Sequence, residues 1–209
     1  AKSVLYELFP FLKSALYTKS YSCLLMEITL ITSNKGKLKE LKKYLKPEIE
    51  VEHIGEEYRE LRSDSPEEIA KEAAKMLAEK LKKPVMVEDS GLFIKALNDF
   101  PGTCSKYIHQ RIGLKGILKL MEGIKDRTCF YKSAIGYCEP GKEPLSFLGE
   151  EKGKIALEEK GSYGFGHDPI FIPENSNKTY GETENCENIK KFRKIAVNKL
   201  KDYLLKKKR

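Results

Sequence analysis

Two consecutive acids follow a short apolar run in the middle of the sequence. Glu88 and Asp89 come directly after Val85-Met86-Val87, and Ser90-Gly91 follows them. Such a run is typical of a buried central strand, and α/β sheets bind ligands beyond the carboxyl ends of their strands. Adjacent residues of an extended chain point to opposite faces, so one acid can face a cleft while the other anchors the loop. With another oxygen ligand the cleft-facing acid could hold Mg²⁺; the alternative is a capped turn with solvated acids.

A polar segment near the start of the sequence is the second place where chemistry is possible. Thr32-Ser33-Asn34-Lys35-Gly36-Lys37 leaves an expected strand and opens an expected helix. Unpaired backbone amides and the helix dipole favour an anion at such a point. The segment lacks the GxxxxGK[ST] pattern of a Walker A loop. Phosphate binding and a simple polar cap therefore both stay open.

The third segment is Gly161-Ser162-Tyr163-Gly164-Phe165-Gly166-His167-Asp168-Pro169. Its three glycines around an aromatic residue permit close approach to a flat ligand, and Asp168 could accept hydrogen bonds from a base edge. A tight loop without a ligand would use the same glycines. The spacing around His167 does not match a metal site, and no GxSxG elbow accompanies Ser90, so a hydrolase triad has no support.

Strands and helices alternate along the chain and must position these segments. Short β-branched or apolar runs predict strands over residues 27–32, 49–54, 85–87, 128–137, 146–151, 152–157 and 170–172. Apolar periodicity and capping residues predict helices over residues 37–45, 66–81, 112–121 and 189–206. A turn at Glu139-Pro140-Gly141-Lys142 predicts a hairpin, which makes the sheet mixed rather than all parallel. We therefore expect an α/β fold.

Composition narrows the class of protein. The 209 residues are 40% apolar and 33% charged, which fits one globular domain of two lobes. The net charge of +8 suits polyanionic partners such as phosphates. Without zinc-finger spacing or tryptophan, we expect no nucleic-acid binding, although tyrosine and phenylalanine could supply stacking surfaces. The five cysteines form no CxxC pair, which argues against a disulfide framework and a structural zinc site and favours the cytoplasm.

The first strand begins directly after Met26, so we expect residues 1–25 to be an N-terminal extension of unknown role and residues 26–209 to form the main domain. The extension could be a docked helix, sequence upstream of the true start, or an arm that binds a partner. Charged residues interrupt its apolar stretches, and no apolar stretch reaches transmembrane length, so we expect neither export nor contact with a membrane.

Together these segments resemble the inosine triphosphate pyrophosphatase family, and archaeal-type members most. From Met26 onward, TSNKGKLKE fits a TxNxxKxxE pattern, VEDSGLFIKAL fits the acidic strand end, and FPGTCSKY and GFGHDPIFIPE fit two further family segments. The resemblance implies a two-lobed α/β fold around a long mixed sheet, a cleft between the lobes and a homodimer. It also implies Mg²⁺-dependent hydrolysis of non-canonical purine nucleoside triphosphates (ITP, dITP, XTP) to monophosphate and pyrophosphate, which sanitises the nucleotide pool. The alternatives are the same chemistry with altered base selectivity, or a nucleotide-binding module without turnover.

The resemblance also implies a role for individual residues. Thr32, Asn34 and Lys37 match triphosphate-binding positions, with Ser33, Lys35 and Gly36 beside them as further substrate-binding residues. Asp89 matches the general base and, with Glu60, the metal ligands, while Lys37 would neutralise charge on the phosphates. Ser90 matches a substrate contact. The base pocket would include Phe165 for stacking, Gly166, His167 and Asp168 for the polar edge. Arg193 matches a further substrate-binding position.

Two departures from the family pattern concern the base. His167 stands where the family commonly has an aromatic residue; it can still stack but adds a titratable edge. The usual KNxxSHR becomes Glu187-Asn188-Ile189-Lys190-Lys191-Phe192-Arg193, so that Glu187, Lys191 and Phe192 replace the lysine, serine and histidine. Because those side chains help to recognise the 6-oxo purine in the family, base selectivity is the property in question. Lys190 or Lys191 could reach the same oxygen.

Overall fold

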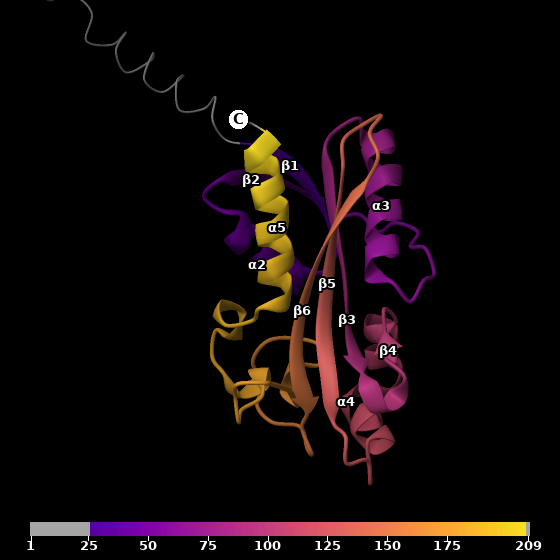
Figure 1. Cartoon of the computed structure of the whole chain (residues 1–209), viewed down its shortest axis with the longest axis vertical. Helices are drawn as coiled ribbons and strands as arrows, with labels where there is room; N and C mark the ends of the chain where they lie inside the picture. Colours follow the sequence, from indigo (N-terminus) through magenta and orange to yellow (C-terminus); the bar gives the residue numbers. More distant parts are fainter. Residues whose placement is uncertain (1–25, 208–209) are drawn as a thin grey trace, which may run out of the picture.

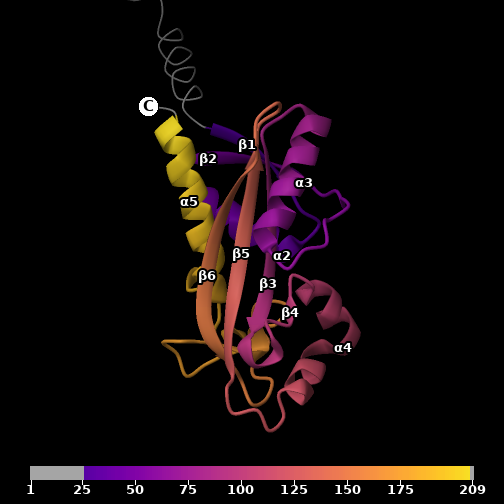
Figure 2. The ribbon, with the colours of Figure 1, turned by 45° about the vertical axis from the view of Figure 1, so that its right-hand side comes forward.

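Three long neighbouring strands run through the centre of the molecule and connect its two lobes (Figures 1 and 2). They are β3 (Val85–Ile94), β5 (Thr128–Cys138) and β6 (Leu145–Ile155), and β5 pairs antiparallel with both β3 and β6. The computed structural model describes residues 26–207, so the expected extension over residues 1–25 lies outside the described part of the chain. Within it, the strands form one mixed seven-stranded sheet, which confirms the predicted α/β class.

The sheet has the order β2-β1-β3-β5-β6-β7, with β4 paired to the far half of β3. The parallel part consists of β1 (Met26–Ile31) between β2 (Ile49–Ile54) and β3. The short strands β4 (Pro101–Gly102) and β7 (Phe171–Pro173) belong to the other lobe. The hairpin between β5 and β6 closes with a hydrogen bond from the Lys142 amide to the Glu139 carbonyl, as the turn signal predicts.

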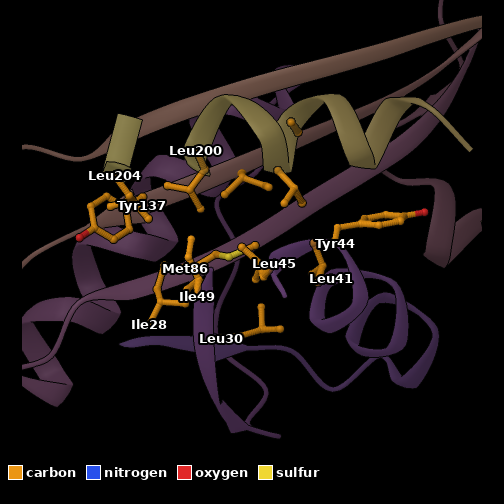
Figure 3. Packing of buried hydrophobic residues seen from close by; sticks show 13 residues of the cluster. Ile28, Leu30, Leu41, Tyr44, Leu45, Ile49, Met86, Tyr137, Leu200 and Leu204 are labelled. Carbon is orange, nitrogen blue, oxygen red and sulfur yellow. The ribbon is translucent and has the colours of Figure 1, made fainter. Parts of the chain in front are cut away.

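Helices cover both faces of the sheet in the lobe that contains β1. On one face lie α2 (Lys35–Leu45) and α5 (Phe192–Lys207), and on the other lies α3 (Pro66–Leu81), as Figure 1 shows. In Figure 3, Leu41 and Leu45 from α2 and Leu200 from α5 point toward Ile28 and Met86 of the strands. These side chains form a continuous apolar core, which holds the start of α2 and the start of α5 against the same part of the sheet.

Glycines in the strands allow two helices to approach the sheet closely. A Cβ added at Gly136 of β5 would lie 1.9 Å from the carbonyl oxygen of Ala70 in α3, and one at Gly149 of β6 would lie 2.0 Å from that of Phe192 in α5. Helix α3 has the predicted bounds, because its start is fixed locally by Ser65, whose hydroxyl accepts a hydrogen bond from the Glu68 amide.

Several predicted elements have other bounds in the structure. The two strands expected over residues 146–151 and 152–157 are one strand, β6, because β5 pairs with it without interruption from Thr128↔Lys154 to Tyr137↔Leu145. Helix α4 (Ser105–Leu120) begins earlier than the predicted residue 112 and is kinked at Gly113. Helix α5 begins at Phe192 rather than 189, because residues 186–188 form a separate 3₁₀ turn.

The chain between β6 and α5 packs against the end of the sheet away from β1. It contains three 3₁₀ turns, Asp168–Ile170, Tyr180–Glu182 and Cys186–Asn188, which pack with α4 around a second apolar core. A further 3₁₀ turn, Lys95–Leu97, follows β3. None of the helices between residues 26 and 207 is long and apolar enough to span a membrane.

Candidate active site

A cleft of about 540 Å³ lies between the two lobes, at the point where β1 has ended and β3 continues. The predicted site residues meet there although they come from segments far apart in the sequence. Twelve of them line the cleft: Thr32, Ser33, Asn34, Lys37, Glu60, Asp89, Ser90, Phe165, Gly166, His167, Asp168 and Arg193. Lys35 and Gly36 do not. Lys35 is exposed to solvent, and Gly36 lies beneath the ring of Phe165, where an added Cβ would come within 2.7 Å of the ring.

The two acids do not stand at the end of a strand, so that prediction is wrong. Strand β3 continues to Ile94 because β5 pairs with it over its whole length, as far as Ile94↔Cys129. The neighbour on the other side, β1, pairs with β3 only through Thr29↔Val85 and Leu30↔Met86. Glu88 and Asp89 therefore lie just beyond the last residue of β1, and the ligand site expected at a carboxyl end is at that of β1.

Glu88 is the acid that anchors the site. Its side chain is fully buried and contacts Lys37 at 2.9 Å, Arg193 at 3.0 Å and the Ser133 hydroxyl at 2.5 Å. Burial would raise the pKa of Glu88, but Arg193 and Lys37 outweigh that effect and hold the pKa at about 2. Glu88 is therefore a permanent carboxylate with all its charge compensated by protein groups.

Asp89 is the acid that keeps a carboxylate oxygen free for a ligand or for water. It lines the cleft, and its Oδ2 is buried without a hydrogen-bond partner among the described residues. Burial raises the pKa of Asp89 from 3.8 to about 7, with Lys37 opposing the rise and Glu88 and Glu60 adding to it. A carboxyl group with a pKa near 7 can take up and release a proton at neutral pH, as a general base must.

The start of α2 brings Lys37 to the acids. Asn34 caps the helix, because its Oδ1 accepts hydrogen bonds from the amides of Gly36 at 2.9 Å and Lys37 at 3.1 Å. The Thr32 hydroxyl accepts a hydrogen bond from the Asn34 amide at 3.2 Å and fixes the turn. From the first turn, Lys37 Nζ reaches both the side chain and the carbonyl oxygen of Glu88, the latter at 3.0 Å. A helix N-terminus and a lysine thus face one end of the cleft, an arrangement that suits phosphates.

The other end of the cleft is built around Asp168, which is 2% exposed. Its carboxylate accepts hydrogen bonds from the Phe165 amide at 2.6 Å, from Lys190 Nζ at 2.7 Å and from the Tyr131 hydroxyl at 3.2 Å. Gly164 has φ of 76°, and an added Cβ there would lie 2.1 Å from Asp168 Oδ2, so the loop requires glycine at this position. Asp168 therefore organises the loop as well as facing the cleft.

His167 is 4% exposed and meets His109 edge to face, with ring centroids 5.1 Å apart. Burial, and to a smaller extent His109, lower the pKa of His167 to about 4. The ring is therefore neutral at pH 7, and the titratable edge expected from the sequence does not change its charge near neutrality.

A chain of buried ion pairs connects the two ends of the cleft. Lys190 binds Glu40 at 3.0 Å, Arg193 binds Glu40 and also Glu88, and Arg193 Nη2 donates to the Ser90 hydroxyl at 3.2 Å. Together with the contacts above, charges alternate in the order Asp168, Lys190, Glu40, Arg193, Glu88, Lys37. Sequence reasoning missed Glu40, although it is the final acid of the TxNxxKxxE pattern.

The structure distinguishes the two lysines at the start of α5. Lys190 is 1% exposed and lines the cleft, whereas Lys191 is exposed and does not line it. Phe192 is buried and stacks on Tyr131 with ring centroids 4.7 Å apart. Glu187 pairs with Lys39 at 2.9 Å outside the cleft lining.

Asp89 and Glu60 are the two acids predicted to bind a metal ion. Both line the cleft, and the unpartnered Asp89 Oδ2 is an oxygen of the kind that Mg²⁺ prefers. Nowhere in residues 26–207 do three or more His, Cys, Asp or Glu side chains gather so that they could hold a metal alone. Because Mg²⁺ commonly uses one or two carboxylates and takes its other ligands from water and substrate phosphates, this donor set fits it.

Comparison with known proteins gives a consistent result. The model of the Ham1 family matches residues 28–203. The chain is 52% identical over 166 residues to the dITP/XTP pyrophosphatase of Methanopyrus kandleri, covering 78% of this chain and 88% of that protein. It is 47% identical over 183 residues to the dITP/XTP pyrophosphatase of Methanosarcina acetivorans, covering 87% and 98%. The solved structure of the Staphylococcus aureus Ham1 protein superposes with a TM-score of 0.76 at 28% identity, covering 87% of this chain and 99% of that one.

Proposed function

The chain belongs to the Ham1 family, and from this membership we propose that it hydrolyses non-canonical purine nucleoside triphosphates such as dITP, ITP and XTP to the nucleoside monophosphate and pyrophosphate. The names of its archaeal relatives support this substrate class. The single observation that carries the chemistry is Asp89, whose unpartnered carboxylate oxygen and pKa of about 7 stand in a cleft beside Lys37.

The residues at the end of the cleft that Lys37 and the start of α2 form suggest how hydrolysis proceeds. The triphosphate would lie against the start of α2, where Lys37 neutralises charge that develops on its oxygens. Asp89 would accept a proton from water as the water oxygen forms a bond to the α-phosphorus. The phosphoanhydride bond between the α- and β-phosphates then breaks, and its electron pair leaves with pyrophosphate. The Asp89 proton is afterwards returned to solvent.

We propose Mg²⁺ as the cofactor, with Asp89 and Glu60 as its protein ligands. When bound, the ion would supply positive charge that offsets the negative charge of the triphosphate. Support comes from the donor set described above and from the coulombic influence of Glu60 on the pKa of Asp89, which indicates that the two carboxylates are near each other.

Replacement of Asp89 tests the assignment of the base. We expect Asp89→Asn to lower kcat for pyrophosphate release from ITP by about 10²–10⁴-fold, the usual contribution of a general base. Asp64→Asn, which changes an exposed aspartate outside the cleft lining, should keep the normal rate. Near-normal release by Asp89→Asn in saturating Mg²⁺ would show that another group activates water.

The altered start of α5 supports a second candidate, which is the same reaction with a shifted choice of base. Glu187, Lys191 and Phe192 stand where the family pattern has other side chains. Comparison of kcat/KM for ITP, XTP, dITP, ATP, GTP and modified pyrimidine triphosphates decides between the two. A preference for ITP and XTP over all others excludes the shift. Nucleotide binding without any pyrophosphate released in Mg²⁺ would instead indicate a binding module.

We also propose that the protein is a homodimer that acts on the cytoplasmic nucleotide pool. The family resemblance supports the dimer, and exposed apolar side chains of the lobe that contains α4, including Tyr107, Ile112 and Tyr163, offer surface for it. Light scattering during size-exclusion chromatography should give twice the mass of the chain. The four cysteines of residues 26–207 are all free thiols, which suits a reducing compartment.

A further inference from the structure

We propose that Lys190 determines base selectivity by donating a hydrogen bond to the 6-oxo group of the purine, in place of the side chains that the altered start of α5 lacks. The inference rests on the proposed function, because it concerns the end of the same cleft that Asp168, Phe165 and Lys190 form, which we call the base end. It assigns the role to one of the two lysines that the sequence leaves open, and it gives the reason why Phe192 and Lys191 need not abolish recognition of the base.

Lys190 has a hydrogen-bonding capacity that its protein partners do not exhaust. Its ammonium group has three N–H donors. Within the described part of the chain, two carboxylates receive hydrogen bonds from it: Asp168 Oδ2 at 2.7 Å and Glu40 Oε1 at 3.0 Å. The third N–H has no hydrogen-bond acceptor among the described residues; Lys190 Nζ lies over the Phe165 ring in a cation–π contact, on a side chain that lines the cleft and is 1% exposed. A buried N–H without an acceptor is unfavourable, so this donor favours a ligand that offers an acceptor oxygen when it excludes water.

The position of Lys190 places this donor at the base end of the cleft. Its Nζ lies 4.5 Å from the ring centroid of Phe165, the aromatic side chain expected to contact the base. The phosphate-binding lysine, Lys37, belongs to the other end of the ion-pair chain, with Glu40, Arg193 and Glu88 between the two cations. The two lysines thus serve different parts of one nucleotide.

Lys190 is held firmly and stays charged. Burial alone would lower the pKa of Lys190, but Asp168 and Glu40 outweigh this and raise it. Asp168 is in turn fixed by hydrogen bonds from the Tyr131 hydroxyl and the Phe165 amide. Tyr131 is packed between Phe171 and Phe192, at centroid distances of 4.2 Å and 4.7 Å. Phe192 therefore supports the donor through Tyr131 and Asp168.

This arrangement discriminates by hydrogen-bond polarity. Hypoxanthine and xanthine carry an oxygen at position 6, which accepts a hydrogen bond from Lys190. Adenine carries an amino group there, which would face the ammonium group as a second donor and leave both without an acceptor. Polar groups that are buried without partners are the main source of discrimination against such analogues. Guanine also has a 6-oxo group, so Lys190 by itself does not exclude it.

The test combines a change in the ligand with a change in the protein. In the unaltered protein, purine riboside triphosphate, which lacks any substituent at position 6, should show about 10- to 100-fold lower kcat/KM than ITP, the factor expected for one hydrogen bond to a charged donor. In Lys190→Met the ratio between the two substrates should fall to about one, because the variant cannot make this bond. Lys191→Met, the matched change at the exposed neighbour, should keep the full ratio.

A purely structural role for Lys190 would give a different pattern. Lys190→Met leaves Asp168 and Glu40 without their cation and is expected to unfold at a lower temperature, so a general loss of rate is not informative. The ratio between the substrates is informative, because loss of structure alone would reduce both rates alike. Lys190→Arg, which keeps the charge, should restore Tm but not the full ratio.

Two results would overturn the inference. One is an unaltered protein that uses ITP and purine riboside triphosphate equally well. The other is a Lys190→Met variant that keeps the preference for ITP. If the protein released no pyrophosphate from any triphosphate, the proposed function would fail by itself. Calorimetric binding of IMP against purine riboside monophosphate would then still decide whether Lys190 reads the oxo group. A preference for IMP in the unaltered protein and in Lys191→Met that is lost in Lys190→Met supports the inference, and a preference kept by Lys190→Met overturns it.

Discussion

The burial that gives Asp89 a pKa suited to catalysis also lowers the stability of the folded protein at neutral pH. Burial raises its pKa from 3.8 to about 7, so ionising this carboxyl is harder in the folded protein than in the unfolded chain. Because the folded pKa is the higher one, the folded protein loses stability relative to the unfolded chain as pH rises from about 4 through 7, and the full loss is present above 7. We expect metal-free Asp89→Asn to unfold with a free energy higher by on the order of 2–4 kcal/mol at pH 8.

Urea unfolding in the presence of EDTA measures this effect. The gain from Asp89→Asn should be smaller at pH 5 than at pH 8, because the folded aspartic acid is then mostly protonated. Asp64→Asn, at an exposed position, should change stability by less than about 0.5 kcal/mol at both pH values. An equal gain at pH 5 and pH 8 would mean that packing, rather than ionisation, distinguishes the variant.

Single site residues could be predicted from the sequence when they belong to a local segment with its own pattern. Lys37 and Asp89 stand in such segments, and both line the cleft. Tyr131 could not be found in this way, because it meets Asp168 across 37 positions of the chain. Glu40 belongs to the TxNxxKxxE segment, but its role could not be predicted, because its partner Arg193 is 153 positions away. The choice between Lys190 and Lys191 depends on the point where α5 begins, which the sequence places three residues too early.

At the scale of elements, boundaries could be predicted where they depend on local chemistry. Helix α3 has the expected bounds because Ser65 and Pro66 fix its start in any surroundings. The sequence predicts that strand β3 ends at Val87, since charged residues rarely occupy the middle of a central strand. It continues because β5 pairs with it beyond this point and because Lys37 and Arg193 compensate the charge of Glu88. Neither cause is local to the segment.

The kink of α4 gives a prediction about an element. Gly113 has φ of 63° and ψ of −168°, a region that is open almost only to glycine, and an added Cβ would meet nothing within 4 Å. Gly113→Ala should therefore lower the free energy of unfolding by about 1–3 kcal/mol through backbone strain alone. Because His109 lies on the same helix and lines the cleft, KM for ITP should rise as well.

Gly55→Ala is the control for this variant. Its nearest neighbour would be His53 at 3.6 Å, and its φ is not positive, so the change should be nearly neutral. Thermal unfolding of both variants, with KM measured at a temperature where each is folded, separates the two effects. Unchanged Tm in Gly113→Ala would show that the helix adopts a regular conformation there.

At the scale of the whole molecule, the fold class could be predicted because alternating strands and helices with one hairpin allow few architectures. The sheet order and the joining of α2, α5 and β3 by buried charges could not. In the structure Arg193 of α5 is 1% exposed and reaches Glu40 of α2 and Glu88 of β3. Sequence patterns identify these residues as charged and therefore favour the surface, whereas only the assembled lobes provide the opposite charges that allow them inside.

This buried network predicts how the whole molecule responds to acid. The pKa of Glu88 falls from its usual 4.5 to about 2 in the folded protein, because Arg193 and Lys37 outweigh the effect of burial. Since the folded pKa is the lower one, the stabilisation is complete above about 4.5 and is lost as pH falls toward 2. A shift of this size corresponds to about 3 kcal/mol.

We expect Glu88→Gln, which keeps the shape of the side chain but loses its charge, to unfold more easily at pH 7 by a similar amount. The difference from the unaltered protein should narrow steadily as urea unfolding is repeated from pH 5 down to pH 3. Glu50→Gln, at an exposed position of β2, should follow the unaltered protein throughout. If Glu88→Gln instead shows the same dependence on pH as the unaltered protein, other carboxylates control acid unfolding, and the ion pairs around Arg193 do not hold the two helices to the sheet as described.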